Sequence, residues 1–447
     1  MKNDILFCML LRPRILIPVI LFLVIIGGGY FGYNWYSNRL PSVRYKTPEE
    51  SDVYVRFGME AYDKILQNYW NKSKDEDMAE LYRLSIVKAA STSPESVTLP
   101  SKDRTGAAKM LYSELGKLSD SDKKQFIAQT VNVAMYNLPP YGRNGLLSKG
   151  QETQLRNDEK NINPAVDLYK DVGVEKGSSP DVVAQKYEEK KAELENIGTP
   201  EAKAELEKVT YAARVLSDEA AKTRYDQNKA EPTVFPKIIG GKTLYVYVSR
   251  VSPTTLQEFG EILIEASTSP QLTSLIVDLR GNIGGTLDFA KYFLGMFLGQ
   301  NQYAFDLFHQ DEYKVERTVM PKITELSKYR EAAVLTDSMT QSTAELISVA
   351  FKKFRLGTVV GTPTRGWGTV ENTFPMETII DPNESYVLLI VHSITLRDDG
   401  QPIEGRGVDP DVNINEQSWE ESLSNFIRLP ELVRAVRETA SISPIRI

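Results

Sequence analysis

The sequence predicts an α/β (α+β) fold with a mixed sheet and helices, preceded by an N-terminal transmembrane helix and helical domains. Residues 15–33 form an uncharged apolar run, and apolar side chains repeat at helical spacing between residues 47 and 228. From residue 237 onward, β-rich segments alternate with helical ones, which indicates layered α/β architecture. A chain of 447 residues is long enough for two or three domains.

The first segment, residues 15–33, is close to the roughly 20 apolar residues that cross a bilayer. Lys2, Arg12 and Arg14 precede it, so the positive-inside rule makes residues 1–14 a cytoplasmic tail. We therefore expect a single-pass membrane protein whose bulk is extracytoplasmic, in a periplasm or at a cell surface. A cleavable signal peptide is the alternative, although no A-x-A motif follows the apolar run.

Composition excludes several functions. The net charge of −7 and the pI near 5.3 argue against nucleic-acid binding, because no domain-wide basic surface offsets phosphate charge. Cys8 is the only cysteine, and His309 and His392 are the only histidines. We therefore expect no metal site built on thiolates or imidazoles, and no cofactor.

The middle of the chain divides into helical regions and a linker. Residues 47–160 read as a helical N-terminal domain, with apolar stripes that we interpret as core, including Tyr54, Phe57, Ala61, Ile65 and Tyr69. A second helical module spans residues 163–228. Residues 229–236 contain two prolines and are expected to link it to the α/β domain, residues 237–447.

The α/β domain contains a strand, a turn and a helix around Ser342. The apolar run 333–336 predicts a strand, the polar run 337–341 a turn, and the spacing after Glu345 a helix that begins near Ser342. Backbone N–H groups converge at a helix N-terminus, so an oxygen anion formed beside Ser342 would meet donors already directed at it. The alternative is an ordinary N-cap, with Glu345 completing a capping box.

A glycine-rich stretch, residues 278–285, reads Asp-Leu-Arg-Gly-Asn-Ile-Gly-Gly. The adjacent Gly284 and Gly285 would let the backbone approach a bound peptide closely. A buried pair of Asp278 and Arg280 beside a glycine turn is the alternative interpretation.

These segments together resemble the C-terminal processing peptidases, also called tail-specific proteases. That family carries a Ser-Ala-Ser-Glu turn followed by Gly-Lys-Gly, where this chain has Ser-Thr-Ala-Glu at 342–345 and Gly-Trp-Gly at 366–368. The glycine-rich stretch is similar to the family's Asp-Leu-Arg-Gly-Asn-Pro-Gly-Gly, and residues 400–411 are similar to its closing segment. The resemblance covers roughly residues 243–414.

The resemblance implies a serine peptidase-like site with Ser342 at the nucleophile position. It places Trp367 at the position of the lysine general base and Glu371 where some members have an orienting glutamine. It also implies an oxyanion site formed by the amide of Thr343 with that of Gly284 or Gly285. An indole has no basic lone pair, so Trp367 cannot accept the serine proton.

We therefore expect a pseudopeptidase that binds polypeptide. Two alternatives remain open. An active serine endopeptidase would use His392 or Glu371 as a rewired base, and a structural envelope protein would use only the helical modules.

Residues 163–228 resemble a degenerate J-domain inserted before the peptidase-like domain. The flanking helices are similar, but residues 195–201 replace the His-Pro-Asp segment, so co-chaperone activity is not implied. The physical expectation is a helical hairpin, with Val182, Val183 and Tyr187 facing residues of the following helix. We expect this module to be a spacer or to dock another protein.

Overall fold

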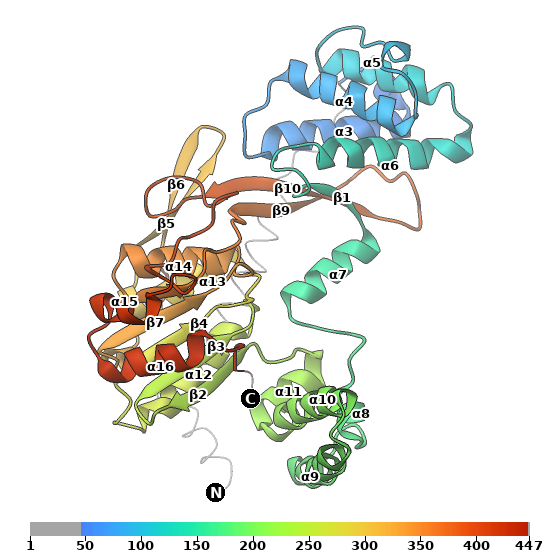
Figure 1. Cartoon of the computed structure of the whole chain (residues 1–447). Coiled ribbons are helices and arrows are strands. Elements are labelled where there is room, and N and C mark those ends of the chain that lie inside the picture. Colours follow the sequence, from blue (N-terminus) through green and yellow to red (C-terminus); the bar gives the residue numbers. More distant parts are fainter. Residues whose placement is uncertain (1–45, 446–447) are drawn as a thin grey trace, which may run out of the picture.

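The computed structural model describes residues 46–445. The predicted cytoplasmic tail, residues 1–14, and membrane anchor, residues 15–33, lie outside these described residues. Between residues 46 and 445, no helix combines the length and apolar character needed to cross a membrane. Figure 1 shows three groups of elements: N-terminal helices, a central α/β unit, and a separate helical module.

The N-terminal helices confirm the predicted helical region. They are α3 (Val53–Asn68), α4 (Asp75–Ala89), α5 (Arg104–Leu115) and α6 (Asp120–Tyr136). Phe57, Ala61 and Ile65 are fully buried, as expected for one apolar stripe on α3. The same core includes Leu388 and Ile390 of β10 (Tyr386–Thr395), so the helices pack on a strand from the far end of the chain.

The main sheet has the order β11-β8-β7-β4-β3-β2 and is parallel except for the edge strand β2. Its strands are β2 (Val234–Ile239), β3 (Thr243–Val248), β4 (Ser274–Asp278), β7 (Glu331–Thr336), β8 (Thr358–Gly361) and β11 (Val412–Asn413). One face carries α12 (Thr255–Ser267), α13 (Leu287–Leu298) and α14 (Thr343–Lys353). The other carries α15 (Trp419–Phe426) and α16 (Pro430–Ala440). This layering confirms the predicted mixed α/β fold.

A second, antiparallel sheet runs between the N-terminal helices and the main sheet (Figure 1). In it β10 pairs with β9 (Thr369–Pro375), with β1 (Gly145–Ser148) and with β5 (Tyr303–His309), which pairs with β6 (Glu312–Arg317). After β1 the chain enters α7 (Lys149–Glu159). The pairings of β10 with β1 and with β5 join segments that are distant in sequence, whereas β5–β6 and β9–β10 each join consecutive strands.

The helical module consists of α8 (Leu168–Val172), α9 (Pro180–Ile197), α10 (Pro200–Ser217) and α11 (Glu219–Asn228). The expected hairpin is formed by α9 and α10, and Val183 is fully buried. Val182 is 49% exposed, so its expected place in the packing face was wrong. Within the expected linker, residues 229–236, the strand β2 begins at Val234, which pairs with Val248 of β3.

Candidate active site

Ser342 lies where β7 passes through a short turn into α14, as the sequence predicted. The buried Thr340 holds this turn by accepting the backbone N–H of Asp337 at 3.0 Å. Ser342 itself adopts φ 58° and ψ −128°, a backbone conformation that is unfavourable for a residue with a Cβ. Such strain persists only where surrounding contacts impose it, and it is concentrated at functional sites.

Glu345 connects Ser342 to the Gly366–Gly368 segment. Its Oε2 accepts the backbone N–H groups of Ser342 and Trp367, both at 2.8 Å. Its Oε1 accepts the N–H of Gly366 at 2.7 Å and the hydroxyl of Thr364 at 2.5 Å. The side chain is completely buried, and burial raises its pKa against the opposing effect of these hydrogen bonds.

The capping interpretation of Ser342 therefore holds only in part. Ser342 and Glu345 have the arrangement of a capping box, but the Ser342 side chain makes no cap hydrogen bond that satisfies normal geometry. Glu345 serves mainly to fix the segment that carries Trp367 against the start of α14. The Ser342 hydroxyl is left available to the pocket.

The loop after β4 lies directly against Ser342. A Cβ on Gly284 would stand 2.6 Å from the Ser342 Cβ and 3.0 Å from the Thr343 nitrogen, and Gly284 has φ +83°. Glycine is required here for both reasons. The amide of Gly284 donates to Asn282 Oδ1 at 2.8 Å, so of the two glycines predicted as alternative oxyanion donors, Gly284 has its N–H occupied in this structure.

Two of the expected amide donors remain open. Within residues 46–445, the N–H groups of Thr343 and Gly285 have no hydrogen-bond acceptor. Thr343 Oγ1 donates to the carbonyl of Gly285 at 2.8 Å and ties the start of α14 to the glycine loop. An oxygen anion beside Ser342 would therefore find two unoccupied amides close together.

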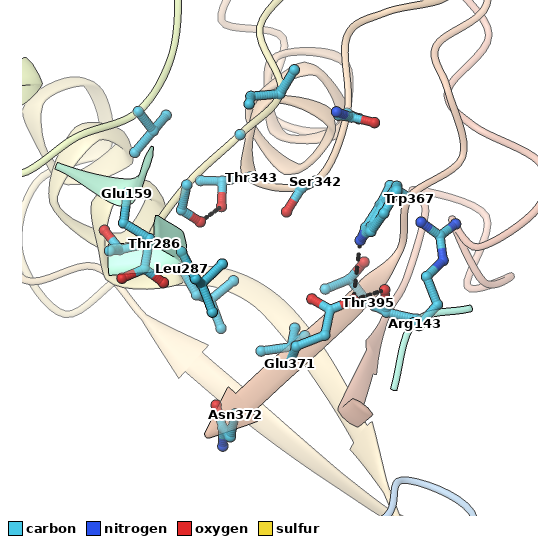
Figure 2. Close-up of a pocket in the computed structure, with 18 of the residues that line it drawn as sticks. Arg143, Glu159, Thr286, Leu287, Ser342, Thr343, Trp367, Glu371, Asn372 and Thr395 are labelled. Atoms are coloured by element: carbon cyan, nitrogen blue, oxygen red, sulfur yellow. Dashed lines mark hydrogen bonds between the residues drawn. The ribbon is translucent and has the colours of Figure 1, made fainter. Parts of the chain in front are cut away.

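Trp367 is held in place by contacts on two sides (Figure 2). Its Nε1 donates to Glu371 Oε1 at 3.1 Å, and the guanidinium of Arg143 lies over its ring, 3.3 Å from the centroid. Arg143 also donates to Glu404 Oε1 at 2.9 Å. The indole is therefore held in one position at the side of the pocket, and its N–H is already donated to Glu371.

Glu371 is the carboxylate beside this wall. Its Oε1 also accepts the hydroxyl of Thr369 at 2.5 Å. Desolvation raises the pKa of Glu371, and the two hydrogen bonds and the charge of Arg143 oppose this rise. A carboxyl group with a raised pKa in a pocket is a candidate proton acceptor, although its oxygen is occupied by two donors.

Ser342, Thr343, Trp367, Gly284, Gly285 and Glu371 all line one pocket of about 770 Å³ (Figure 2). None of the described residues that line it is a lysine or a histidine. His392 lies outside it and stacks on His309, with ring centroids 4.2 Å apart and planes 8° apart. Burial lowers the pKa of His392 to about 4. The structure thus does not bring His392 to Ser342.

Asp278 and Arg280 form the buried pair beside the glycine turn that was given above as the alternative interpretation. Arg280 Nε donates to the fully buried Asp278 at 2.9 Å, and Tyr245 donates to the same carboxylate at 2.6 Å. Arg280 also donates to the carbonyls of Ala440 and Ile442. This pair joins β4 to the end of α16 and stands apart from the pocket.

Sequence reasoning missed Arg143 and Glu404. Arg143 lies in a turn of Pro, Gly and Asn residues, a composition that predicts only a turn. Glu404 accepts the Gly368 N–H at 2.8 Å and pairs with Arg143, within residues 400–411, which were noted only for their similarity to the family's closing segment. No spacing links these residues in the sequence. Among the described residues, no group of His, Cys, Asp and Glu side chains could hold a metal ion.

Comparison with known proteins gives the same assignment as the motifs. Residues 242–414 match Peptidase family S41. The chain is 26% identical over 183 residues to the carboxy-terminal processing protease CtpB of Bacillus subtilis (strain 168), covering 41% of this chain and 36% of that protein. It is 24% identical over 180 residues to the Probable CtpA-like serine protease of Staphylococcus aureus (strain N315). That match covers 40% of this chain and 35% of the relative.

The matches span only about a third of the curated relatives, 36% and 35% of their lengths. The structure of the photosystem II D1 C-terminal processing protease aligns with 87% of this chain and 98% of its own, at 13% identity and a TM-score of 0.49. The sequence matches make this chain a peptidase S41 homologue with distant similarity to C-terminal processing proteases.

Proposed function

We propose that this peptidase S41 homologue binds polypeptide in the Ser342 pocket without hydrolysing it. The observation that carries the proposal is the lining of the pocket: the serine and two free amides are present, but none of its described residues is a lysine or histidine. Peptide hydrolysis by serine requires a neighbour that accepts the hydroxyl proton. Trp367 donates through Nε1 and has no lone pair to accept with, and the guanidinium of Arg143 offers only donors.

A rewired peptidase that uses Glu371 is the second candidate. Glu371 lines the same pocket and its pKa is raised by burial, which would make it a stronger base than an exposed carboxylate. Against it, both Trp367 and Thr369 donate to its Oε1. A proton transfer from Ser342 would have to compete with these donors.

The location and the partners are also part of the proposal. Residues 15–33 would anchor the protein in a membrane, with the pocket on the extracytoplasmic side. The module of α8 to α11 would dock another protein, since its α9 carries the exposed Val182 and Ile197. Its hairpin lacks a His-Pro-Asp segment, so co-chaperone activity is not part of the proposal. If neither polypeptide binding nor hydrolysis exists, the third possibility, a structural envelope protein, would hold.

The test uses two measurements on the full-length protein in detergent. Binding of fluorescein-labelled β-casein, an unfolded polypeptide, would be followed by anisotropy, and its cleavage by gel electrophoresis. A fluorophosphonate probe would report an activated serine. We expect casein binding, no cleavage and no labelling. Labelling that disappears in Ser342→Ala and weakens in Glu371→Gln would establish the rewired peptidase, and absence of both binding and labelling would favour the structural protein.

A further inference from the structure

The strand β6 lies at one end of the antiparallel sheet and leaves its outer edge unpaired (Figure 1). Among the described strands it pairs with β5 alone. Proteins usually block such an edge with a proline, a bulge or charged side chains, because it is a template for a further strand. The strand β6 has no proline, and the one register shift of the hairpin falls in β5, between Tyr303 and Phe305.

The hydrogen bond that follows β6 shows which of its backbone groups face outward. The N–H of Thr318 donates to the carbonyl of Gln302 at 2.9 Å, so Thr318 faces the side of β5. Residues in an antiparallel strand alternate between facing the partner and facing away. The even-numbered residues of β6 therefore face β5, and Tyr313, Val315 and Arg317 face outward. Within residues 46–445, the backbone groups of these three residues make no hydrogen bond to another residue.

The side chains along this edge are both apolar and charged. Tyr313 is 67% exposed and Val315 49% exposed, and the two lie on the same face of the strand because they are two residues apart. On the opposite face, Lys314 and Glu316 form an ion pair, with Nζ and Oε1 2.5 Å apart. The edge thus carries exposed apolar surface next to two opposite charges.

A second copy of β6 can pair with this edge about a two-fold axis, and the charges discriminate between registers. Outward residues must lie opposite outward residues, so the axis passes through one residue position. An axis at Lys314 or at Glu316 places that charge opposite its own copy, which is unfavourable. An axis at Tyr313 sets Glu312 opposite Lys314, but it leaves Glu316 and Arg317 beyond the end of the partner's strand.

An axis at Val315 uses the whole strand without a conflict of charge. Lys314 then lies opposite Glu316 of the second copy, and this pair occurs twice. Arg317 lies opposite Tyr313, whose ring attracts a guanidinium. Val315 meets its own copy, so the apolar side chain at the centre is covered by an apolar one.

We propose that two copies of this chain associate by antiparallel pairing of their β6 edges, with the two-fold axis at Val315. The occupant is a second copy because the charge pattern of the strand is complementary to itself in this register. Lys314, which would otherwise block the edge, is neutralised there by Glu316 of the partner subunit. No residue of β6 lines the Ser342 pocket, so the pairing leaves both pockets outside the interface.

Val315→Lys tests the position of the axis. The two introduced lysines would face each other, and like charges directly opposite destabilise strand pairing. Val319→Lys is the matched control, because Val319 is 38% exposed and follows the end of β6. Sedimentation velocity of the full-length protein in detergent measures the dimer dissociation constant. We expect Val315→Lys to weaken the dimer about fivefold or more, and Val319→Lys to change it about twofold or less.

A disulfide across the axis gives an independent readout. Cys8, the only cysteine of the chain, is first replaced by serine. In that background Val315→Cys would place two thiols on facing strands with Cα atoms about 5.5 Å apart, within the range that a disulfide bridges. Val319→Cys is the control, because the two copies of this residue would lie too far apart. We expect oxidation to give a covalent dimer with the cysteine at position 315 and not at position 319.

Three results would overturn the proposal: a wild type that is monomeric at every concentration tested, a dimer that withstands Val315→Lys, or no disulfide at position 315. Binding of β-casein does not depend on β6, so Val315→Lys should bind it as the wild type does. Loss of the dimer and loss of the proposed function are therefore measured separately. If Val315→Lys does not fold, as judged by circular dichroism, the disulfide result decides.

Discussion

Glu345 accepts the backbone N–H of Trp367 with the same oxygen, Oε2, that accepts the N–H of Ser342, each at 2.8 Å. Ser342, at the predicted nucleophile position, and Trp367, at the position predicted for the lysine base, are therefore fixed to each other through one buried carboxylate. The proposed loss of hydrolysis is attributed to the side chain at position 367, in a pocket that still holds the serine and two unoccupied amides.

Trp367→Lys tests this attribution directly. The substitution removes the indole from its contacts with Arg143 and Glu371, and we expect a loss of about 1.5–3 kcal/mol in unfolding free energy. It also supplies an amine beside Ser342, so we expect fluorophosphonate labelling to appear. Trp367→Met is the control, since it loses the indole without adding a base. Labelling that is absent in W367K, with a wild-type melting temperature, would contradict our view of this position.

The strained backbone of Ser342 leads to a comparison of two substitutions. At φ 58° and ψ −128°, glycine relieves a strain of about 1–3 kcal/mol, less an entropic cost of about 0.5–1 kcal/mol. We expect Ser342→Gly to be about 1 kcal/mol more stable than Ser342→Ala in chemical denaturation. Equal stabilities would show that the position is not strained.

The stack of Arg143 on Trp367 should be measurable as a coupling energy. In a double-mutant cycle of Arg143→Ala and Trp367→Leu, we expect a coupling of about 0.5–2 kcal/mol. Arg143 also pairs with Glu404, so the single Arg143 substitution alone would not separate the two contacts. The same cycle with Glu404→Gln in place of the tryptophan substitution measures the ion pair. Additive effects in the first cycle would show that the stack contributes nothing.

The raised pKa of Glu371 gives a pH dependence with a definite sign. Between the unfolded pKa near 4.5 and the higher folded pKa, the folded state binds more protons than the unfolded state. The contribution of this group to stability therefore falls as pH rises through that window. We expect the difference in melting temperature between Glu371→Gln and wild type to shift in favour of the variant as pH increases. A pH-independent difference would argue against a raised pKa.

The pH dependence of stability from His392 has the opposite sign. The pKa of His392 falls from 6.5 to about 4, so the unfolded state binds the extra proton between these values. Stability from this group is present above pH 6.5 and is lost as pH falls, by roughly 2–3 kcal/mol near pH 4. His392→Phe retains an aromatic ring opposite His309 and should remove this slope. Urea denaturation of both proteins at pH 7 and pH 4.5 tests the prediction.

The fold was predictable where the signal was local and periodic. The apolar run 333–336 and the helical spacing after Glu345 placed Ser342 correctly, because strand and helix each carry their own period. The β-rich segments expected after residue 237 include the strands Thr243–Val248 and Ser274–Asp278 for the same reason. Burial in a parallel sheet leaves a continuous apolar run that the sequence shows directly.

The site was less predictable where a contact joined distant segments. Asn282 takes the amide of Gly284, and no spacing reveals that a side chain competes for a backbone donor. Arg143 reaches Trp367 only because β1 pairs with β10, a pairing between opposite ends of the chain.

The pairing of β1 with β10 also determines when the pocket can close during translation. Asn144 accepts the Val391 N–H at 2.7 Å, next to the arginine that walls the pocket. The N-terminal helices α3 to α6 and Arg143 are translated early, whereas β10 is translated only after most strands of the main sheet. A nascent chain thus displays the serine before its cavity is closed, and capture of other polypeptides would be a property of the finished molecule alone.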